Sequence, residues 1–161
     1  MDRRTLFAAG ALAAMMPATG PGFAQTAPDR EKQPILLAGN FALLTSRLAA
    51  DRAADPAVKA FSALEISEQQ AVAQAFGAAP SEQLTPEHAA MLEELTALPA
   101  GPEFDMKYLD GQLTGHEQLR ALHASYAKGG SDPRAQGASI VAVPAIDSHL
   151  SMLRAIRQRM G

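Results

Sequence analysis

The chain contains no cysteine and no tryptophan, and aromatic residues make up only 5% of its 161 residues. The absence of cysteine excludes disulfides, thiolate metal sites, a cysteine nucleophile and a lipoprotein anchor. The fold must therefore depend on packing alone. β-Branched residues are sparse, whereas Ala and Leu dominate, which favours helices. No strand pattern and no internal repeat is recognisable, so an all-α fold is expected.

The first 24 residues have the three parts of a secretory signal peptide. Arg3 and Arg4 precede an uncharged run over residues 6–16, which is about 11 residues against the roughly 20 that span a bilayer. Small residues at the two positions that signal peptidase reads predict cleavage after Ala24. We therefore expect a periplasmic or secreted protein with no stable membrane span after cleavage.

The Arg3-Arg4 pair, followed by Thr5-Leu6-Phe7, resembles the twin-arginine export signal. Proteins that use this route cross the membrane already folded, often with a cofactor in place. The alternative is an ordinary secretory signal that begins with two arginines. Residues 25–33 are polar and contain proline, which predicts a flexible leader before a domain over residues 34–161.

Removal of residues 1–24 leaves about 137 residues, a length that suits one domain. The remaining 12 basic and 16 acidic residues have a net charge of −4. A mildly acidic chain gives no reason to expect nucleic-acid binding. No glycine-rich phosphate loop and no Ser-His-Asp arrangement is recognisable, and an enzyme is the less favoured interpretation.

Prolines and glycines divide the domain into four long predicted helices and one short one. Apolar residues recur at helical spacing in each segment, and prolines occur at the starts. The last predicted helix is interrupted near Gly137 and Pro144. Four long helices with short connectors predict an antiparallel four-helix bundle with one extra short helix. The predicted helices span residues 34–54, 56–79, 86–98, 102–128 and 132–160.

Polar residues lie on the apolar faces of three predicted helices. A rotation of about 100° per residue places Glu65 and Glu68 beside the apolar stripe of the second helix, which includes Leu64. His116 falls within the apolar arc of the fourth helix and His149 within that of the fifth. All four lie near the middle of their helices, so helices in register would bring them into one layer. The first helix has a purely Leu and Phe central stripe.

Buried carboxylates cost free energy unless they are paired or bound to a cation. Glu65, Glu68, His116 and His149 together suit one transition-metal ion, Fe, Mn, Zn or Cu. A structural network is the alternative, because Glu and His can form a hydrogen-bonded ion pair. The protein would then be a non-catalytic structural or interaction module of the cell envelope. An iron-dependent redox enzyme is a further alternative, and it requires an open coordination position.

Other polar residues of the same helices belong to different layers. Asp105 lies roughly 16 Å from His116 along the predicted axis, and His123 lies about 10 Å away in the other direction. Both are too distant to share a site with His116. His88 falls in the first turn of the short helix and is expected to be exposed.

The last two long helices contain the pattern Phe104-Asp105-x-x-Tyr108-x-x-x-Gln112-x-x-x-His116, followed by Pro144 and His149. This pattern resembles a known bacterial family, called domain of unknown function 4142. The resemblance covers most of residues 35–157 and implies a ferritin-like helical bundle in exported proteins, with no established activity. The family often has an acidic residue in the first helix, where this chain has Ala42 or Leu44, and a histidine in the second, where Gln69 aligns. A single-metal site, or none, is therefore favoured over a two-iron centre.

Overall fold

A computed structural model describes residues 30–161, which form five helices and their connections. These residues contain no strand, as the composition predicts. The predicted signal peptide over residues 1–24, its cleavage position and most of the leader lie outside the described residues. The helices are α1 (Gln33–Arg52), α2 (Pro56–Ala75), α3 (Pro86–Ala97), α4 (Pro102–Gly129) and α5 (Pro133–Met160).

Local sequence signals account for where the helices begin and end. Asp55, Thr85 and Asp132 each accept a hydrogen bond from a backbone N–H in the first turn of α2, α3 and α5. A proline follows each of these caps, where its missing N–H costs nothing. Gly77 takes a left-handed conformation, with φ of 76°, just beyond α2. For this reason α2 ends at Ala75 rather than at the predicted residue 79.

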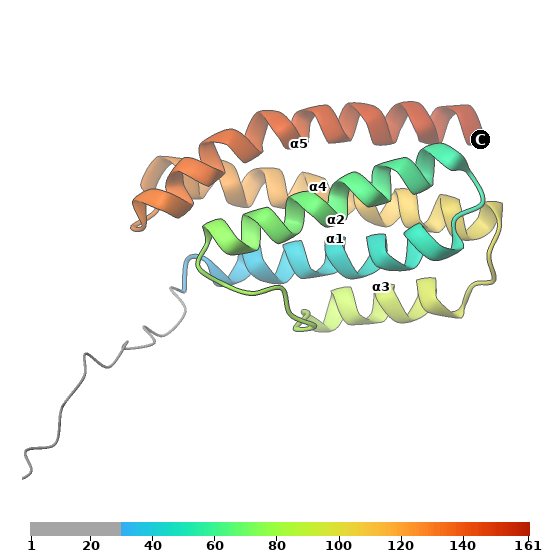
Figure 1. Cartoon of the computed structure of the whole chain (residues 1–161), viewed down its shortest axis with the longest axis horizontal. Helices are drawn as coiled ribbons and strands as arrows, with labels where there is room; N and C mark the ends of the chain where they lie inside the picture. Colours follow the sequence, from blue (N-terminus) through green and yellow to red (C-terminus); the bar gives the residue numbers. More distant parts are fainter. Residues whose placement is uncertain (1–29) are drawn as a thin grey trace, which may run out of the picture.

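Consecutive helices run in opposite directions along the long axis of the molecule (Figure 1). The helix α1 packs against α2 and α4, and α5 packs against the same two helices. These four long helices therefore enclose one interior. The short helix α3 lies outside that interior, beside α1 and α4.

The helix α5 is continuous, so the predicted interruption near Gly137 and Pro144 is wrong. Pro144 is exposed, and its ring therefore has no neighbouring helix to displace. The carbonyl that loses its hydrogen-bond donor belongs to Ile140, which is also exposed and can bond to water. The axis of α5 bends along its first half (Figure 1), as a proline within a helix causes.

Among the described helices, only α5 is long and apolar enough, by length and composition, to cross a membrane. The core helix of a soluble protein can have the same length and composition. Ion pairs connect the outer face of α5 to α4: Arg154 contacts Glu117 at 3.1 Å and Arg157 contacts Asp110 at 2.7 Å. These exposed contacts and the apolar packing both hold α5 against α4.

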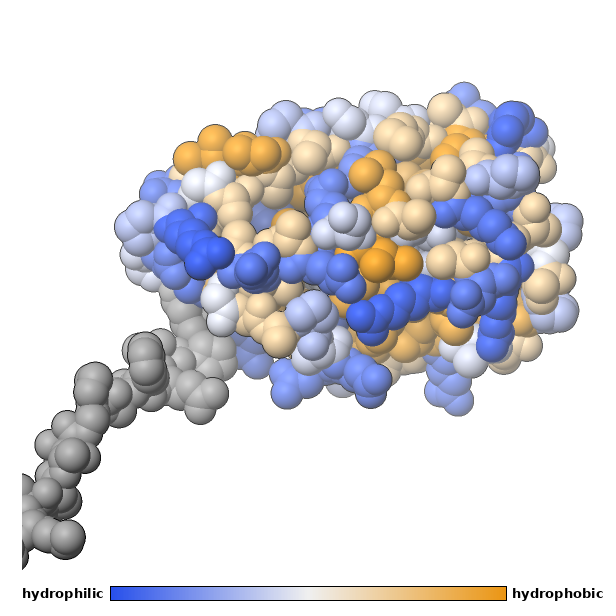
Figure 2. Space-filling model, in the orientation of Figure 1, coloured by the Kyte–Doolittle hydropathy of each residue, from blue (hydrophilic) through white to orange (hydrophobic). Residues whose placement is uncertain are grey.

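The surface mixes polar and apolar side chains (Figure 2). Leu64, which the sequence places in the apolar stripe of α2, is instead 43% exposed. It lies one residue before the buried Glu65, so the two side chains point in different directions around the helix. The polar residue, rather than the leucine, faces the interior at this height.

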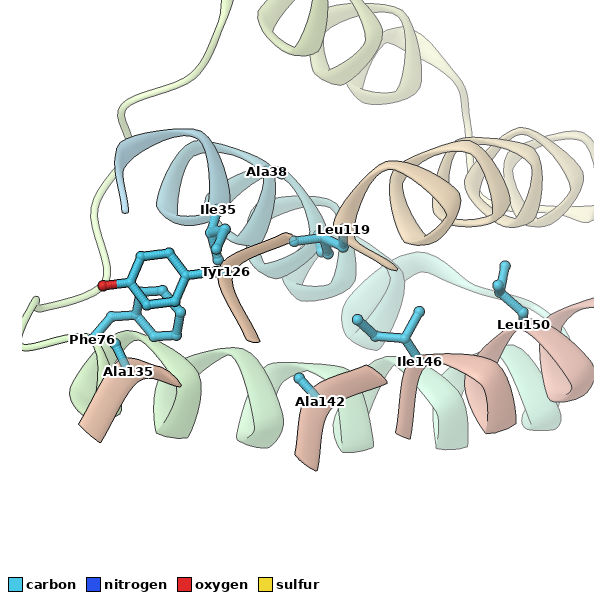
Figure 3. Packing of buried hydrophobic residues seen from close by; sticks show 10 residues of the cluster. Ile35, Ala38, Phe76, Leu119, Tyr126, Ala135, Ala142, Ile146 and Leu150 are labelled. Carbon is cyan, nitrogen blue, oxygen red and sulfur yellow. The ribbon is translucent and has the colours of Figure 1, made fainter. Parts of the chain in front are cut away.

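Two apolar clusters fill the interior, one toward each end of the long axis, and Figure 3 shows part of the first. Leu113 packs against both clusters. Along α4 and α5 the change from one cluster to the other takes place near His116 and His149. The polar residues therefore lie where the two clusters meet. The first cluster contains Ile35, Phe76, Leu119, Tyr126, Ile146 and Leu150, and the second contains Val58, Phe61, Phe104, Tyr108, Leu109 and Leu153.

Candidate metal centre

Three of the four predicted ligands converge in the interior. Glu65 on α2 and His116 on α4 are fully buried, and His149 on α5 is 5% exposed. One ligand atom from each lies within 4.8 Å of the others. The ring of Phe61 packs near both histidines, with centroid distances of 5.8 Å to His116 and 5.5 Å to His149. This ring covers the group on one side and excludes water from it.

The three ligand atoms form an equilateral triangle. Glu65 Oε2 lies 3.3 Å from His116 Nε2 and 3.3 Å from His149 Nδ1, and the two nitrogens are also 3.3 Å apart. These distances exceed the usual 2.7–3.2 Å of a hydrogen bond with an N–H donor. In a tetrahedron with this edge the centre lies roughly 2.0 Å from each corner, which is a typical zinc–ligand distance. The triangle therefore has the dimensions of one face of a tetrahedral metal site.

The outward hydrogen bond of His116 determines which of its nitrogens carries a proton. Its Nδ1 lies 2.8 Å from the carbonyl oxygen of Gln112. A carbonyl oxygen only accepts, so Nδ1 must donate. A neutral His116 therefore presents the bare lone pair of Nε2 to the carboxylate of Glu65, which is also an acceptor. A cation in the triangle, either an added proton or a metal ion, would remove this conflict.

Glu68 lies on the other side of His149. Its Oε2 is 3.3 Å from Nε2 of His149, whereas the triangle uses Nδ1 of the same ring. The side chain of Glu68 is 25% exposed. The predicted layer is therefore divided into three side chains around a common point and one carboxylate toward solvent. A neutral His149 that donates Nε2–H to Glu68 has a bare Nδ1 facing the triangle.

The charges of this cluster are strongly coupled. Burial by itself raises the pKa of Glu65, but the contacts with His116 and His149 outweigh burial and lower that pKa to about 2. Burial likewise lowers the pKa of His149, but the contacts with Glu65 and Glu68 raise it above its ordinary value. Burial also raises the pKa of Glu68. Glu65 is thus an ionised carboxylate that requires positive charge beside it.

A fourth buried partner, Gln69, was not recognised as part of the site from the sequence. Its Nε2 donates a hydrogen bond of 2.9 Å to Oε1 of Glu65. Gln69 occupies the position where the family resemblance implies a histidine. The signal that could have revealed it is the spacing of four residues from Glu65, which places the two side chains on one face of α2.

The helix α1 also contributes polar groups to the interior, so the prediction of a purely Leu and Phe stripe there is wrong. Thr45 accepts a hydrogen bond of 2.7 Å from Nε2 of Gln112, and Ser46 bonds the hydroxyl of Tyr108 at 2.9 Å. Small hydroxyl residues in a helix are easily overlooked because they also occur on exposed faces. These hydrogen bonds join α1 to α4 beside the candidate metal ligands.

The remaining buried polar residues have other partners. Asp105 accepts hydrogen bonds from the backbone N–H groups of Ala54 and Asp55, and so holds the connection between α1 and α2. His88 is 5% exposed and stacks on Phe41 with a centroid distance of 4.5 Å, so its predicted exposure is wrong. His88 is buried because it faces α1, whereas Pro86 and Glu87 in the same turn are exposed.

Comparison with known proteins identifies the family. The family model described as Domain of unknown function (DUF4142) matches residues 24–156, and the chain belongs to this family. The resemblance seen in the pattern from Phe104 to His149 is therefore confirmed. No curated protein and no solved structure matches the chain.

Proposed function

We propose that this protein is an exported, ferritin-like four-helix bundle that binds one divalent transition-metal ion through Glu65, His116 and His149. The observation that carries the proposal is the triangle of three ligand atoms with 3.3 Å edges. Both outward ring nitrogens have an acceptor beside them, so neutral imidazoles would direct lone pairs rather than protons at the carboxylate. One cation satisfies all three groups.

In this proposal Glu68 is not a ligand but orients one. Its Oε2 lies 3.3 Å from Nε2 of His149, so its negative charge favours the tautomer that carries the proton on Nε2 and leaves Nδ1 free for a metal. Carboxylates commonly hold ligating histidines in this way. Two histidines and one carboxylate suit Zn²⁺, Fe²⁺ or Mn²⁺ and leave at least one coordination position for water or a substrate.

Elemental analysis of protein exported by its native route tests the proposal. We expect about one metal ion per chain, and a chelator should lower the melting temperature. Re-addition of the ion at about a hundred times its Kd should restore roughly 2.7 kcal/mol of stability. The variant His116→Ala should lose the metal, whereas His123→Ala, a change at another buried histidine of α4, should retain it. Metal-free protein with no thermal response to Fe, Mn, Zn or Cu would contradict the proposal.

The second candidate is a structural module of the envelope with a protonated network in place of the metal. It is favoured by the raised pKa of His149, since an imidazolium there would supply the missing positive charge. In that case His116→Ala should destabilise the fold without any change in metal content. Nitrogen-15 NMR of the histidine side chains distinguishes a doubly protonated ring from a metal-bound one.

Export is the other part of the proposal. The Arg3-Arg4 pair and the small-residue cleavage position support a twin-arginine signal and a periplasmic or secreted protein. A protein that crosses the membrane folded can acquire its metal beforehand. Export should therefore fail when Arg3→Lys and Arg4→Lys are combined, and unimpaired export of that variant would remove this support.

A further inference from the structure

The two carboxylate oxygens of Glu65 have different surroundings. Oε2 lies 3.3 Å from a nitrogen of each histidine, as described above. Oε1 accepts the hydrogen bond of 2.9 Å from Nε2 of Gln69. Because a carboxylate only accepts, the amide of Gln69 must direct its NH₂ group, and not its oxygen, toward Glu65. Oε1 is therefore hydrogen-bonded within α2, whereas Oε2 forms one corner of the triangle.

A glycine on α1 provides the space for this arrangement. A Cβ atom added to Gly39 would lie 2.7 Å from Oε1 of Gln69, which is closer than real Cβ contacts. Gln69 is 7% exposed, so its amide has little room to move elsewhere. The backbone of α1 at Gly39 and the carboxylate of Glu65 thus hold the amide between them.

We infer that Gln69 is a positioning residue that determines which metal the site prefers. By engaging Oε1, it leaves Glu65 to bind through Oε2 alone, so the protein supplies three ligand atoms. Three protein ligands and one exogenous ligand form the four-coordinate site that Zn²⁺ favours, whereas Mn²⁺ prefers more oxygen ligands. This inference rests on the proposed metal site and specifies its class of ion.

Loss of the amide would change the coordination number. A carboxylate with both oxygens free can bind a cation through both, which adds a ligand atom. In the native protein, recruitment of Oε1 would break a buried hydrogen bond and leave the amide of Gln69 without its partner, which is unfavourable. Gln69 therefore favours one binding mode of Glu65 over the other.

Cobalt(II) is a suitable probe, because four-coordinate Co²⁺ absorbs visible light more strongly than six-coordinate Co²⁺. We expect strong visible bands from the wild type and weaker bands from Gln69→Leu. In competition titrations, Gln69→Leu should lower the Zn²⁺ affinity roughly 10- to 100-fold and the Mn²⁺ affinity less. The matched control is Gln70→Leu at the neighbouring exposed glutamine, which should behave as the wild type.

A second variant moves the amide without removing it. Gly39→Ala places a methyl group against Gln69, and alanine favours a helix more than glycine does. Its Co²⁺ spectrum and its ratio of Zn²⁺ to Mn²⁺ affinity should shift in the same direction as those of Gln69→Leu. The matched control is Gly137→Ala in α5, where an added Cβ has no neighbour within 4 Å. Thermal melts establish that each variant is folded.

The outcomes separate this inference from the proposed site. Wild-type protein that binds none of Co²⁺, Zn²⁺ and Mn²⁺ would overturn the site and the inference together. Wild-type protein that binds these ions, with Gln69→Leu and Gly39→Ala retaining its spectrum and affinity ratio, would leave the site intact and refute the role of Gln69.

Discussion

Two buried histidines of α4, His116 and His123, lie two turns apart and have different surroundings. Both are at most 1% exposed. His116 faces a carboxylate and a second imidazole, each at 3.3 Å. His123 instead bonds the hydroxyl of Ser139 at 3.0 Å and meets the edge of Phe76, with a centroid distance of 5.6 Å. The residue type, the helix and the burial are the same, and only the neighbours differ.

The neighbouring side chains decide whether positive charge is needed around each of these two histidines. Burial without a carboxylate lowers the pKa of His123 to about 4, so this ring is neutral and its hydroxyl partner satisfies it. Around His116 the ionised Glu65 requires a cation instead. A buried histidine alone is therefore no sign of a metal site. The informative feature is a buried carboxylate whose neighbours direct lone pairs at it.

The largest expected effect is that of His116→Ala in the presence of a chelator. Loss of one partner of a buried charged contact should lower the free energy of unfolding by about 3–5 kcal/mol. Urea unfolding of His116→Ala and His123→Ala measures the difference, since each variant leaves a cavity of the same kind. Equal costs would show that the contact with Glu65 contributes nothing particular to stability.

The pH dependence of folding stability should reveal the neutral state of His123. An unfolded histidine titrates near 6.5, whereas burial lowers the pKa of His123 to about 4 in the folded protein. Between these values only the unfolded chain takes up the proton, so the stability due to His123 is complete above pH 6.5 and falls by about 3 kcal/mol toward pH 4. Urea unfolding across this range should give a flatter curve for His123→Gln than for the wild type. Parallel curves would contradict the prediction.

A smaller effect, on metal affinity, is expected from Glu68→Gln. The amide can still accept a hydrogen bond from His149 but lacks the negative charge, so metal affinity should fall only about 10-fold. Glu65→Gln should abolish binding, because a ligand oxygen loses its charge. Isothermal titration with Zn²⁺ measures both. Equal losses from the two substitutions would identify Glu68 as a ligand, as the sequence pattern predicts.

The smallest effect is expected from Ser139→Ala. This change removes one buried hydrogen bond from the layer of His123 and should cost about 1 kcal/mol. Metal content should be unchanged, because the nearest candidate ligand on α4 is two turns away. Elemental analysis and urea unfolding check the two parts. A loss of metal would show that the two layers are coupled.

Much of the helical framework could be predicted from local signals. Caps such as Asp55 and Thr85, each followed by proline, define helix starts within the chain itself. The common height of Glu65, His116 and His149 follows from the fixed rise of a helix and from short connectors. The exposure of Leu64 and the burial of His88 could not be predicted, because both depend on which helices pack alongside.

By itself the sequence determined an all-helical chain, its family and four polar side chains near one height, namely Glu65, Glu68, His116 and His149. Only the tertiary structure decided that His116 and His149 face the same oxygen of Glu65, and that Glu68 lies outside the triangle. The physical reason is that hydrogen bonds along a helix are local, whereas the site joins residues 51 and 33 positions apart. Small rotations of each helix about its own axis select the facing atoms, and those rotations are set by the packing of all four helices.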